Sequence, residues 1–434
     1  MVDIPDDWER VRTETLAADE PHAMATGPFG SSIGSATFIP EPGVPVVRGS
    51  NLSEDVGQRL SHDKLVFIPG PLADKFRRSE ARDGDLIFTC WGTIGQVGLV
   101  DKRARYPRYI VSNKQMKLSV NTGRVDSLFL YYCFSSPEVS GSIRSQKIGS
   151  SVPGFNLGQL KAIELNLPPI DEQRRIAAVL GALDDKIELN RKMNRTLEEM
   201  AQAIFKSWFI DFDGVDASEM VDSELGPIPK GWKIAELEKA SSYLRRGISP
   251  KYTEEGGVAV INQKCIRECR VSLEKARRHD PAKRKIDGRE LQVGDVLVNS
   301  TGVGTLGRVA QLDSLDEPLI CDSHVTVVRA APEVDALFLG AQLMHLQPVI
   351  EGMGHGSTGQ TELSRKNLGT LRVRLPGREL QDSFADTVRP LRAKMSANEQ
   401  QSETLAQLRD TLLPKLISGE IRVPAAEKTI EATL

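Results

Sequence analysis

Cysteine, excess charge and long apolar runs are all scarce in this chain of 434 residues. Its five cysteines are scattered and odd in number, which is typical of reduced thiols rather than of a disulfide framework. A net charge of −3 excludes binding by bulk charge, so any nucleic-acid surface must be local. No apolar run is long enough to span a bilayer, and residues 1–12 are too polar for a signal peptide. We therefore expect a cytoplasmic protein without a membrane partner.

Sequence patterns for catalysis and cofactor binding are missing as well. There is no Gly-Lys-Ser/Thr phosphate loop, and the glycines around Gly92 do not open a helix of the dinucleotide-binding kind. Cys265 and Cys269 lack a second Cys or His pair at zinc-finger spacing. Residues 166–169 (Asn-Leu-Pro-Pro) differ from the Asn-Pro-Pro-aromatic motif of adenine methyltransferases and fit a strand that ends before a helix. We predict no catalytic residue, no metal site and no cofactor in this chain.

A duplication is the main feature that the sequence does contain. Residues 176–204 and 384–412 carry apolar or small residues at spacings that alternate four and three, and the two segments lie 208 residues apart without a gap. A heptad pattern of this kind predicts paired helices. The positions expected to pair are Leu180, Leu183, Ile187, Asn190 and Leu197 in the first segment and Val388, Leu391, Met395, Asn398 and Leu405 in the second.

Each heptad segment follows a domain-sized block, and the two blocks share the same landmarks. A Pro-x-x-Trp turn opens each block, and a Gly-Asp turn precedes an apolar strand and then a glycine loop. A β-rich run and a Leu-Pro pair before each helix complete the repeat. This order predicts domains at 1–170 and 211–376, spacer helices at 171–210 and 377–419, and a tail at 420–434.

The order of blocks and helices also fixes the direction of the helix pair. A compact second block brings the end of the first helix close to the start of the second, so the coil must be antiparallel with a pseudo-twofold axis. Asn190 and Asn398 then face each other at that axis. The stripe from Ile176 to Ile204 is about 42 Å long at ~1.5 Å per residue, which matches roughly twelve base pairs of B-DNA. Apolar residues beyond the stripe, Phe205, Trp208 and Phe209, indicate a further packing partner, either the adjacent block or another protein.

Six segments carry a resemblance to a known family: 27–32, 47–51 and 167–176 in the first half, and 246–252, 262–266 and 299–302 in the second. With them the chain resembles the specificity subunits of type I restriction-modification systems, up to about Val423. The resemblance implies an α/β protein with two mixed-sheet target-recognition domains and two long antiparallel coiled-coil helices. Each domain would read one half of a split, asymmetric sequence in double-stranded DNA. The helices would dock two modification subunits and restriction subunits, and those partners would use S-adenosylmethionine, ATP and Mg.

Contacts to DNA need cations for phosphates and forked or amide side chains for base edges. Residues of these types lie beside the glycine loops and in basic stretches. A charge run is also typical of a merely solvated face, so a duplicated protein-interaction scaffold that never binds DNA is the alternative. The candidate DNA contacts are Ser31, Arg48, Asn51, Thr93 and Lys114 in the first block, and Arg246, Lys251, Tyr252, Asn262, Gln263, Lys264, Thr305 and Arg308 in the second.

Overall fold

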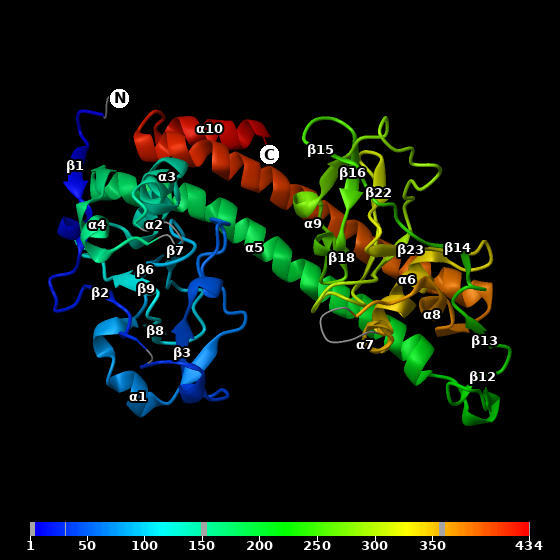
Figure 1. Cartoon of the computed structure of the whole chain (residues 1–434). Coiled ribbons are helices and arrows are strands. Elements are labelled where there is room, and N and C mark those ends of the chain that lie inside the picture. Colours follow the sequence, from blue (N-terminus) through cyan, green and yellow to red (C-terminus); the bar gives the residue numbers. More distant parts are fainter. Residues whose placement is uncertain (1–4, 31, 149–153, 356–360, 434) are drawn as a thin grey trace. The chain divides into compact units, whose positions relative to one another are not determined.

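The computed structural model of the chain describes residues 5–30, 32–148, 154–355 and 361–433. The chain divides into two compact units. Unit 1 comprises residues 1–190 and 401–434, and unit 2 comprises residues 191–400. Each unit therefore combines one globular domain with a part of both long helices, α5 (Ile170–Lys206) and α9 (Arg378–Ser418), which Figure 1 shows in green and orange-red. This division differs from the predicted one, in which the helices stand apart from the domains.

Unit 1 contains two four-stranded sheets, ordered β2-β9-β6-β7 and β4-β3-β8-β5. Strands β3 and β8 run parallel while their other neighbours are antiparallel, so the second sheet is mixed as predicted, whereas the first is antiparallel throughout. A further antiparallel pair, β1 and β10, leads into α5. The strands are β1 Glu9–Arg12, β2 Met24–Thr26, β3 Val44–Val47, β4 Val66–Ile68, β5 Glu80–Ala81, β6 Leu86–Thr89, β7 Val97–Leu99, β8 Tyr109–Val111, β9 Gln115–Leu118 and β10 Glu164–Leu167.

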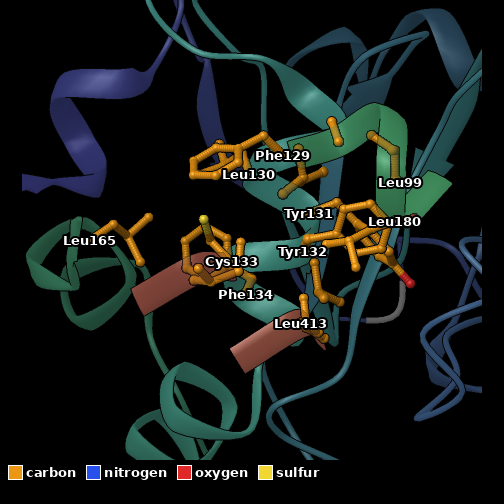
Figure 2. Close-up of a cluster of buried hydrophobic side chains, with 14 of the residues drawn as sticks. Leu99, Phe129, Leu130, Tyr131, Tyr132, Cys133, Phe134, Leu165, Leu180 and Leu413 are labelled. Carbon is orange, nitrogen blue, oxygen red and sulfur yellow. The ribbon is translucent and has the colours of Figure 1, made fainter. Parts of the chain in front are cut away.

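Helix α2 (Ser127–Ser135) lies at the centre of the core of unit 1. Asp126 caps its start by accepting a hydrogen bond from the Phe129 amide. Figure 2 shows the aromatic side chains of α2 packed among Leu165, Leu180 and Leu413, which come from β10, α5 and α9. Burial of each large side chain contributes roughly 1.5–3 kcal/mol. Because these side chains pack against residues of β10, α5 and α9, helix α2 joins the strands of unit 1 to both long helices. The other short helices are α1 Gly70–Asp74, α3 Pro137–Ser145 and α4 Leu157–Ala162.

Unit 2 repeats this architecture. Its four-stranded sheets are ordered β14-β23-β20-β21 and β15-β19-β16-β22, and β16 and β22 are the parallel pair. Antiparallel pairs β11 with β12, β13 with β24 and β17 with β18 complete it. The strands are β11 Met220–Val221, β12 Ile228–Pro229, β13 Lys233–Glu236, β14 Ser241–Arg246, β15 Tyr252–Thr253, β16 Val258–Ile261, β17 Ile266–Arg267, β18 Arg270–Val271, β19 Arg277–His279, β20 Val296–Asn299, β21 Val309–Gln311, β22 Leu319–Cys321, β23 Val325–Ala330 and β24 Arg372–Leu375, and the short helices are α6 Ala336–His345, α7 Gln347–Gly352 and α8 Arg365–Gly369.

The long helices α5 (Ile170–Lys206) and α9 (Arg378–Ser418) run antiparallel. In unit 1 the first part of α5 packs against the last part of α9, with Leu180 and Leu405 in one buried cluster. In unit 2 the last part of α5 packs against the first part of α9, with Ala201 and Val388 in one cluster. The predicted antiparallel pair is therefore confirmed. Of the predicted pairing positions, Leu197 and Leu391 are only half-buried.

Buried asparagines repeat one contact in the two units. In unit 1 the Asn190 side chain donates hydrogen bonds to Gln401 and Ser402. In unit 2 the Asn398 side chain donates to Asn194. Asn190 and Asn398 occupy the same position of the repeat, and so do Asn194 and Ser402. The predicted face-to-face pairing of Asn190 with Asn398 joins residues of different units and stays a prediction.

The start of α9 follows the start of α5 although their sequences differ. The Gln173 amide accepts from the Asp126 backbone and donates to Pro168. Gln381 makes the same two contacts, with the Asp335 backbone and Pro376. A single glutamine thus fixes each helix start on the preceding domain.

The segments that follow the two heptad stripes pack in different units. Beyond the first stripe, Phe205 and Phe209 are fully buried against Phe338 and Phe384 in unit 2. Their packing partner is therefore the adjacent domain. Beyond the second stripe, the tail forms helix α10 (Val423–Thr433), whose Val423 joins the core of unit 1.

Buried charges attach the domain of unit 1 to its helices. Asp184 on α5 is fully buried and accepts hydrogen bonds from Arg409 Nη1 at 2.9 Å and from the Tyr132 hydroxyl at 2.5 Å. Arg59, from the loop after β3, lies 3.9 Å from Asp184 and donates to Asp101. Burial and the nearby carboxylate raise the pKa of Tyr132 well above its usual value. These charges are paired with one another, as buried charges must be.

Candidate nucleic-acid interface

Four segments of unit 1 meet at one end of its two sheets. Ser112 donates to the Val47 carbonyl, which brings the ends of the parallel strands β8 and β3 together. Beside them, Gly27 donates to Gln115 and Cys90 donates to Lys114. We call the described residues of 27–34, 48–51, 90–96 and 112–115 the loop end of unit 1. It collects ends of the six strands β2, β3, β6, β7, β8 and β9, so its side chains can act on one ligand together.

Two glycines are required at this end because backbones touch there. A Cβ atom on Gly27 would lie 1.9 Å from the Ser112 carbonyl oxygen, and one on Gly247 in unit 2 would lie 2.0 Å from the Cys321 oxygen. Either distance is a severe clash. The two units therefore use the same close approach to hold the segment after β2 or β14 against the parallel strands.

The glycine loops are matched in position but differ in length. Cys90 donates to Lys114 in unit 1, and Ser300 donates to His324 in unit 2. The loops close where Thr89 donates to Gln96, and where Asn299 donates to Arg308. Because unit 2 has two more residues between these bonds, Gly92 corresponds to Gly302, and both have positive φ angles that favour glycine. We call residues 247–251, 262–265, 300–308 and 322–324 the loop end of unit 2.

Three of the predicted contacts in unit 1 lie at its loop end with polar atoms near the surface. Lys114 and Thr93 are exposed, and the Thr93 hydroxyl donates to Gln96. Arg48 is half-buried and donates to the Lys64 carbonyl. Ser31 lies outside the described residues.

Asn51 is a correction to the sequence analysis. Its side chain is fully buried, accepts from the Arg48 backbone and donates to the carbonyls of Ser61 and Asp63. The amide thus holds the loop after β3 in shape, and the structure argues against a contact between Asn51 and a base.

In unit 2 the predicted residues fall into two groups. The first lies at the loop end: Lys251 and Lys264 are exposed, Gln263 accepts from the Thr301 hydroxyl, and Arg308 donates to Gly304. Thr305 lies in the glycine loop and is half-buried. Asn262 corresponds to Arg48, since its amide donates to the Lys275 carbonyl as Arg48 donates to that of Lys64. It therefore shapes its own loop.

The second group is held by partners within the chain. Arg246 pairs with Glu362 at 2.5 Å and donates to the Leu363 carbonyl. The Tyr252 ring lies 3.3 Å from the guanidinium of Arg277, so its face is used in a cation–π contact. These contacts hold both side chains against the protein, so neither projects freely from the surface.

Several cations of the basic stretches have structural partners that sequence analysis missed. Lys102 and Arg103 both pair with Asp185 on α5. Arg108 pairs with Asp74 and Glu80. The exposed apolar residues Phe29 and Trp91 at the loop end of unit 1, and Val303 at that of unit 2, were also missed. The signal available in the sequence was that an aromatic residue, Phe29, lies in the 27–32 segment.

The described residues form no metal-binding cluster, and two of their thiols have raised pKa values. No cluster of three or more His, Cys, Asp or Glu side chains in the described part of the chain has the arrangement to hold a metal ion. Burial raises the pKa of the Cys90 thiol to about 12 and that of Cys269 to about 11. Both thiols are therefore protonated near neutral pH and poor nucleophiles. Among the described helices, none is long and apolar enough to cross a bilayer.

The two matched loop ends and the parts of α5 and α9 in each unit define a class of protein with two duplicated domains and two long helices. A family model described as the type I restriction modification DNA specificity domain matches residues 75–199. The chain is 28% identical over 365 residues to the type I restriction enzyme MjaIX specificity subunit of Methanocaldococcus jannaschii, with 78% of each chain covered. It is 22% identical over 383 residues to the HindI specificity subunit of Haemophilus influenzae, with 72% of this chain and 81% of that protein covered. The chain is thus similar to the specificity subunits of type I restriction-modification systems over more than two thirds of its length.

A solved structure shares the fold. The crystal structure of a type I restriction-modification system S subunit from M. genitalium matches with a TM-score of 0.57 and 16% sequence identity. The match covers 96% of this chain and 97% of that one. The predicted fold class, two duplicated mixed-sheet domains with two long antiparallel helices, is thereby confirmed.

Proposed function

We propose that the loop end of each unit reads one half of a split, asymmetric sequence in double-stranded DNA. The observation that carries this proposal is that the two loop ends share their backbone contacts but not their side chains. Gln96 and Arg308 close the matched glycine loops, and Lys114 and His324 occupy the matched turns. Two scaffolds of one shape with different polar groups suit two different sets of base edges.

The helices α5 and α9 are proposed to dock two modification subunits and, in the complete complex, restriction subunits. The chain itself is a non-catalytic subunit in this proposal, and its partners bind S-adenosylmethionine, ATP and Mg. Its five free thiols suit a reducing compartment, which supports a place in the cytoplasm. A specificity subunit without catalytic groups needs such partners for methylation and cleavage.

The test is a genome-wide map of methylated adenines with and without this gene, followed by Arg308→Ala and Thr93→Ala. If Arg308 contacts a base, its substitution costs on the order of 1–3 kcal/mol of binding and relaxes only the half-site read by unit 2. Thr93→Ala changes the glycine loop of unit 1 and should affect the other half-site. A continuous or palindromic methylated sequence would contradict the proposal. A chain that binds duplex weakly and without sequence preference would favour the scaffold alternative.

A further inference from the structure

The loop end of unit 1 carries an aromatic side chain that the fold does not use. Phe29 is 91% exposed, whereas the other phenylalanines of this unit's core, such as Phe129 and Phe134, are fully buried. A single exposed apolar residue is common on protein surfaces. The position of Phe29 is what distinguishes it, because it lies at the surface that we propose to face DNA.

The backbone around Phe29 is fixed while its side chain projects. On one side, Gly27 is held by its hydrogen bond to Gln115 and by the close approach to Ser112. On the other side, the Asn113 side chain donates to the Gly30 carbonyl at 3.2 Å. The Phe29 carbonyl accepts from the Ser32 hydroxyl at 2.8 Å. A Cβ atom on Gly30 would meet nothing within 4 Å, so the loop tip borders open space.

The neighbours of this ring suit a nucleic acid. Lys114 is exposed and directly follows Asn113, which places a cation beside the loop tip. Trp91 follows Cys90, whose amide donates to Lys114, and its ring lies against Gly154, where a Cβ atom would be 2.5 Å from the ring. Trp91 is still 49% exposed. Exposed aromatic side chains and a cation at one loop end are the groups that can enter a groove, contact base faces and bind phosphate.

From this arrangement we propose that Phe29 is a wedge that inserts against one base step of the half-site read by unit 1. Unit 2 has no aromatic residue at the corresponding place, because the second residue after Gly247 is Ser249. Insertion partly unstacks a step and bends the duplex, and pyrimidine–purine steps yield most easily. The inference rests on the proposed function, and it predicts that only one half of the target is deformed.

The experiment uses the full chain assembled with its modification subunits and a duplex that carries the mapped target. 2-Aminopurine is placed in turn at each step of both half-sites, because its fluorescence rises when it is unstacked. We expect a rise at one step in the half-site of unit 1 and none in the other. Phe29→Ala should abolish the rise and weaken binding to the target roughly ten- to hundredfold, while Phe29→Trp should retain both. Val293→Ala is the matched control, since Val293 is exposed but precedes the Gly-Asp turn at the other end of its sheet.

The remaining outcomes separate this inference from the proposed function. Sequence-specific binding by the wild type without any unstacked step would overturn the wedge and leave the proposed function intact. A Phe29→Ala variant that loses affinity equally for target and random duplex would also overturn the wedge, because the ring would then contact DNA without regard to sequence. A Phe29→Ala variant that fails to assemble with its modification subunits would overturn it too, because the ring would then contact another protein. A wild-type complex that does not distinguish target from random duplex would overturn both, and Arg308→Ala would then be silent as well.

Discussion

The buried carboxylate of Asp184 offers the sharpest test of how the first domain is attached to the helices. Asp184→Asn keeps the volume and removes the charge. Arg409 lies 2.9 Å away and Arg59 lies 3.9 Å away. At an effective dielectric constant of about 20, a unit charge pair near 4 Å is worth about 4 kcal/mol. Removing the carboxylate forfeits these attractions and recovers several kcal/mol of its own desolvation penalty, so we expect a net loss of about 3–5 kcal/mol.

The loss should appear as faster amide hydrogen exchange in unit 1. Hydrogen exchange read by mass spectrometry is the suitable assay, because a chain with two units has no single two-state unfolding free energy. Peptides from α2 and from the first part of α5 should lose protection, while those of unit 2 should not. Glu164→Gln is the matched control in the same unit. It removes an exposed ion pair with Arg10 and should cost about 1 kcal/mol or less.

A double variant tests the pairing itself. Asp184→Leu with Arg409→Leu removes both charges at once and should recover most of the loss, because hydrophobic replacement of a whole buried pair is often neutral. A loss below about 1 kcal/mol for Asp184→Asn would show that the buried carboxylate does not hold the domain to the helices. A double variant that is less stable than the sum of its single variants would refute the pairing.

Three further predictions concern packing, pH and assembly. Gly27→Ala should unfold the loop end of unit 1, because its Cβ atom would lie 1.9 Å from a carbonyl oxygen. Gly30→Ala meets no atom within 4 Å and should cost only about 1–2 kcal/mol for its positive φ. Thermal melts and hydrogen exchange distinguish the two variants. Burial lowers the pKa of His62 below its usual 6.5. The stability that the neutral imidazole contributes is therefore present above about pH 6.5 and is lost as the pH falls through the folded-state pKa. The hydrogen-exchange protection of unit 1 should fall from pH 7 to pH 5, and it should fall less in His62→Gln. Leu183→Asp with Leu391→Asp puts charge between the packed helices α5 and α9 and should cost several kcal/mol of stability. The double variant should no longer co-purify with modification subunits, and all methylation should be lost. Methylation that persists would exclude the helices as the assembly platform.

The duplicated architecture was predictable because its signals are local or periodic. A heptad stripe needs only the spacing of apolar residues, and Leu180 and Leu405 are buried as that spacing predicts. The start of α9 was harder, since only Gln381 preserves the contacts made by Gln173. One residue among unrelated neighbours is too little for a pattern to detect.

The candidate site was less predictable because its side chains depend on contacts far along the chain. Asn51 has the side chain of a base-reading residue, yet it satisfies backbone groups ten and twelve residues away. Lys102 and Arg103 belong to a basic stretch of the sequence, but both pair with Asp185 on α5. Phe29 was missed for the opposite reason: an apolar residue is expected in the core, and only the structure shows that it projects.

The charges that attach the two domains to the helices have opposite signs, and this has a consequence for folding. Asp184 and Arg392 occupy the same position of the repeat. In unit 1 the helix supplies the carboxylate and the domain supplies Arg59, whereas in unit 2 the helix supplies Arg392 and the domain supplies Asp313. A domain that docked on the wrong part of the helix pair would bury two like charges. Each domain is thereby matched by charge to its own part of the helices as the chain folds. If the proposed function holds, this match would fix which half of the target each domain reads before any partner binds.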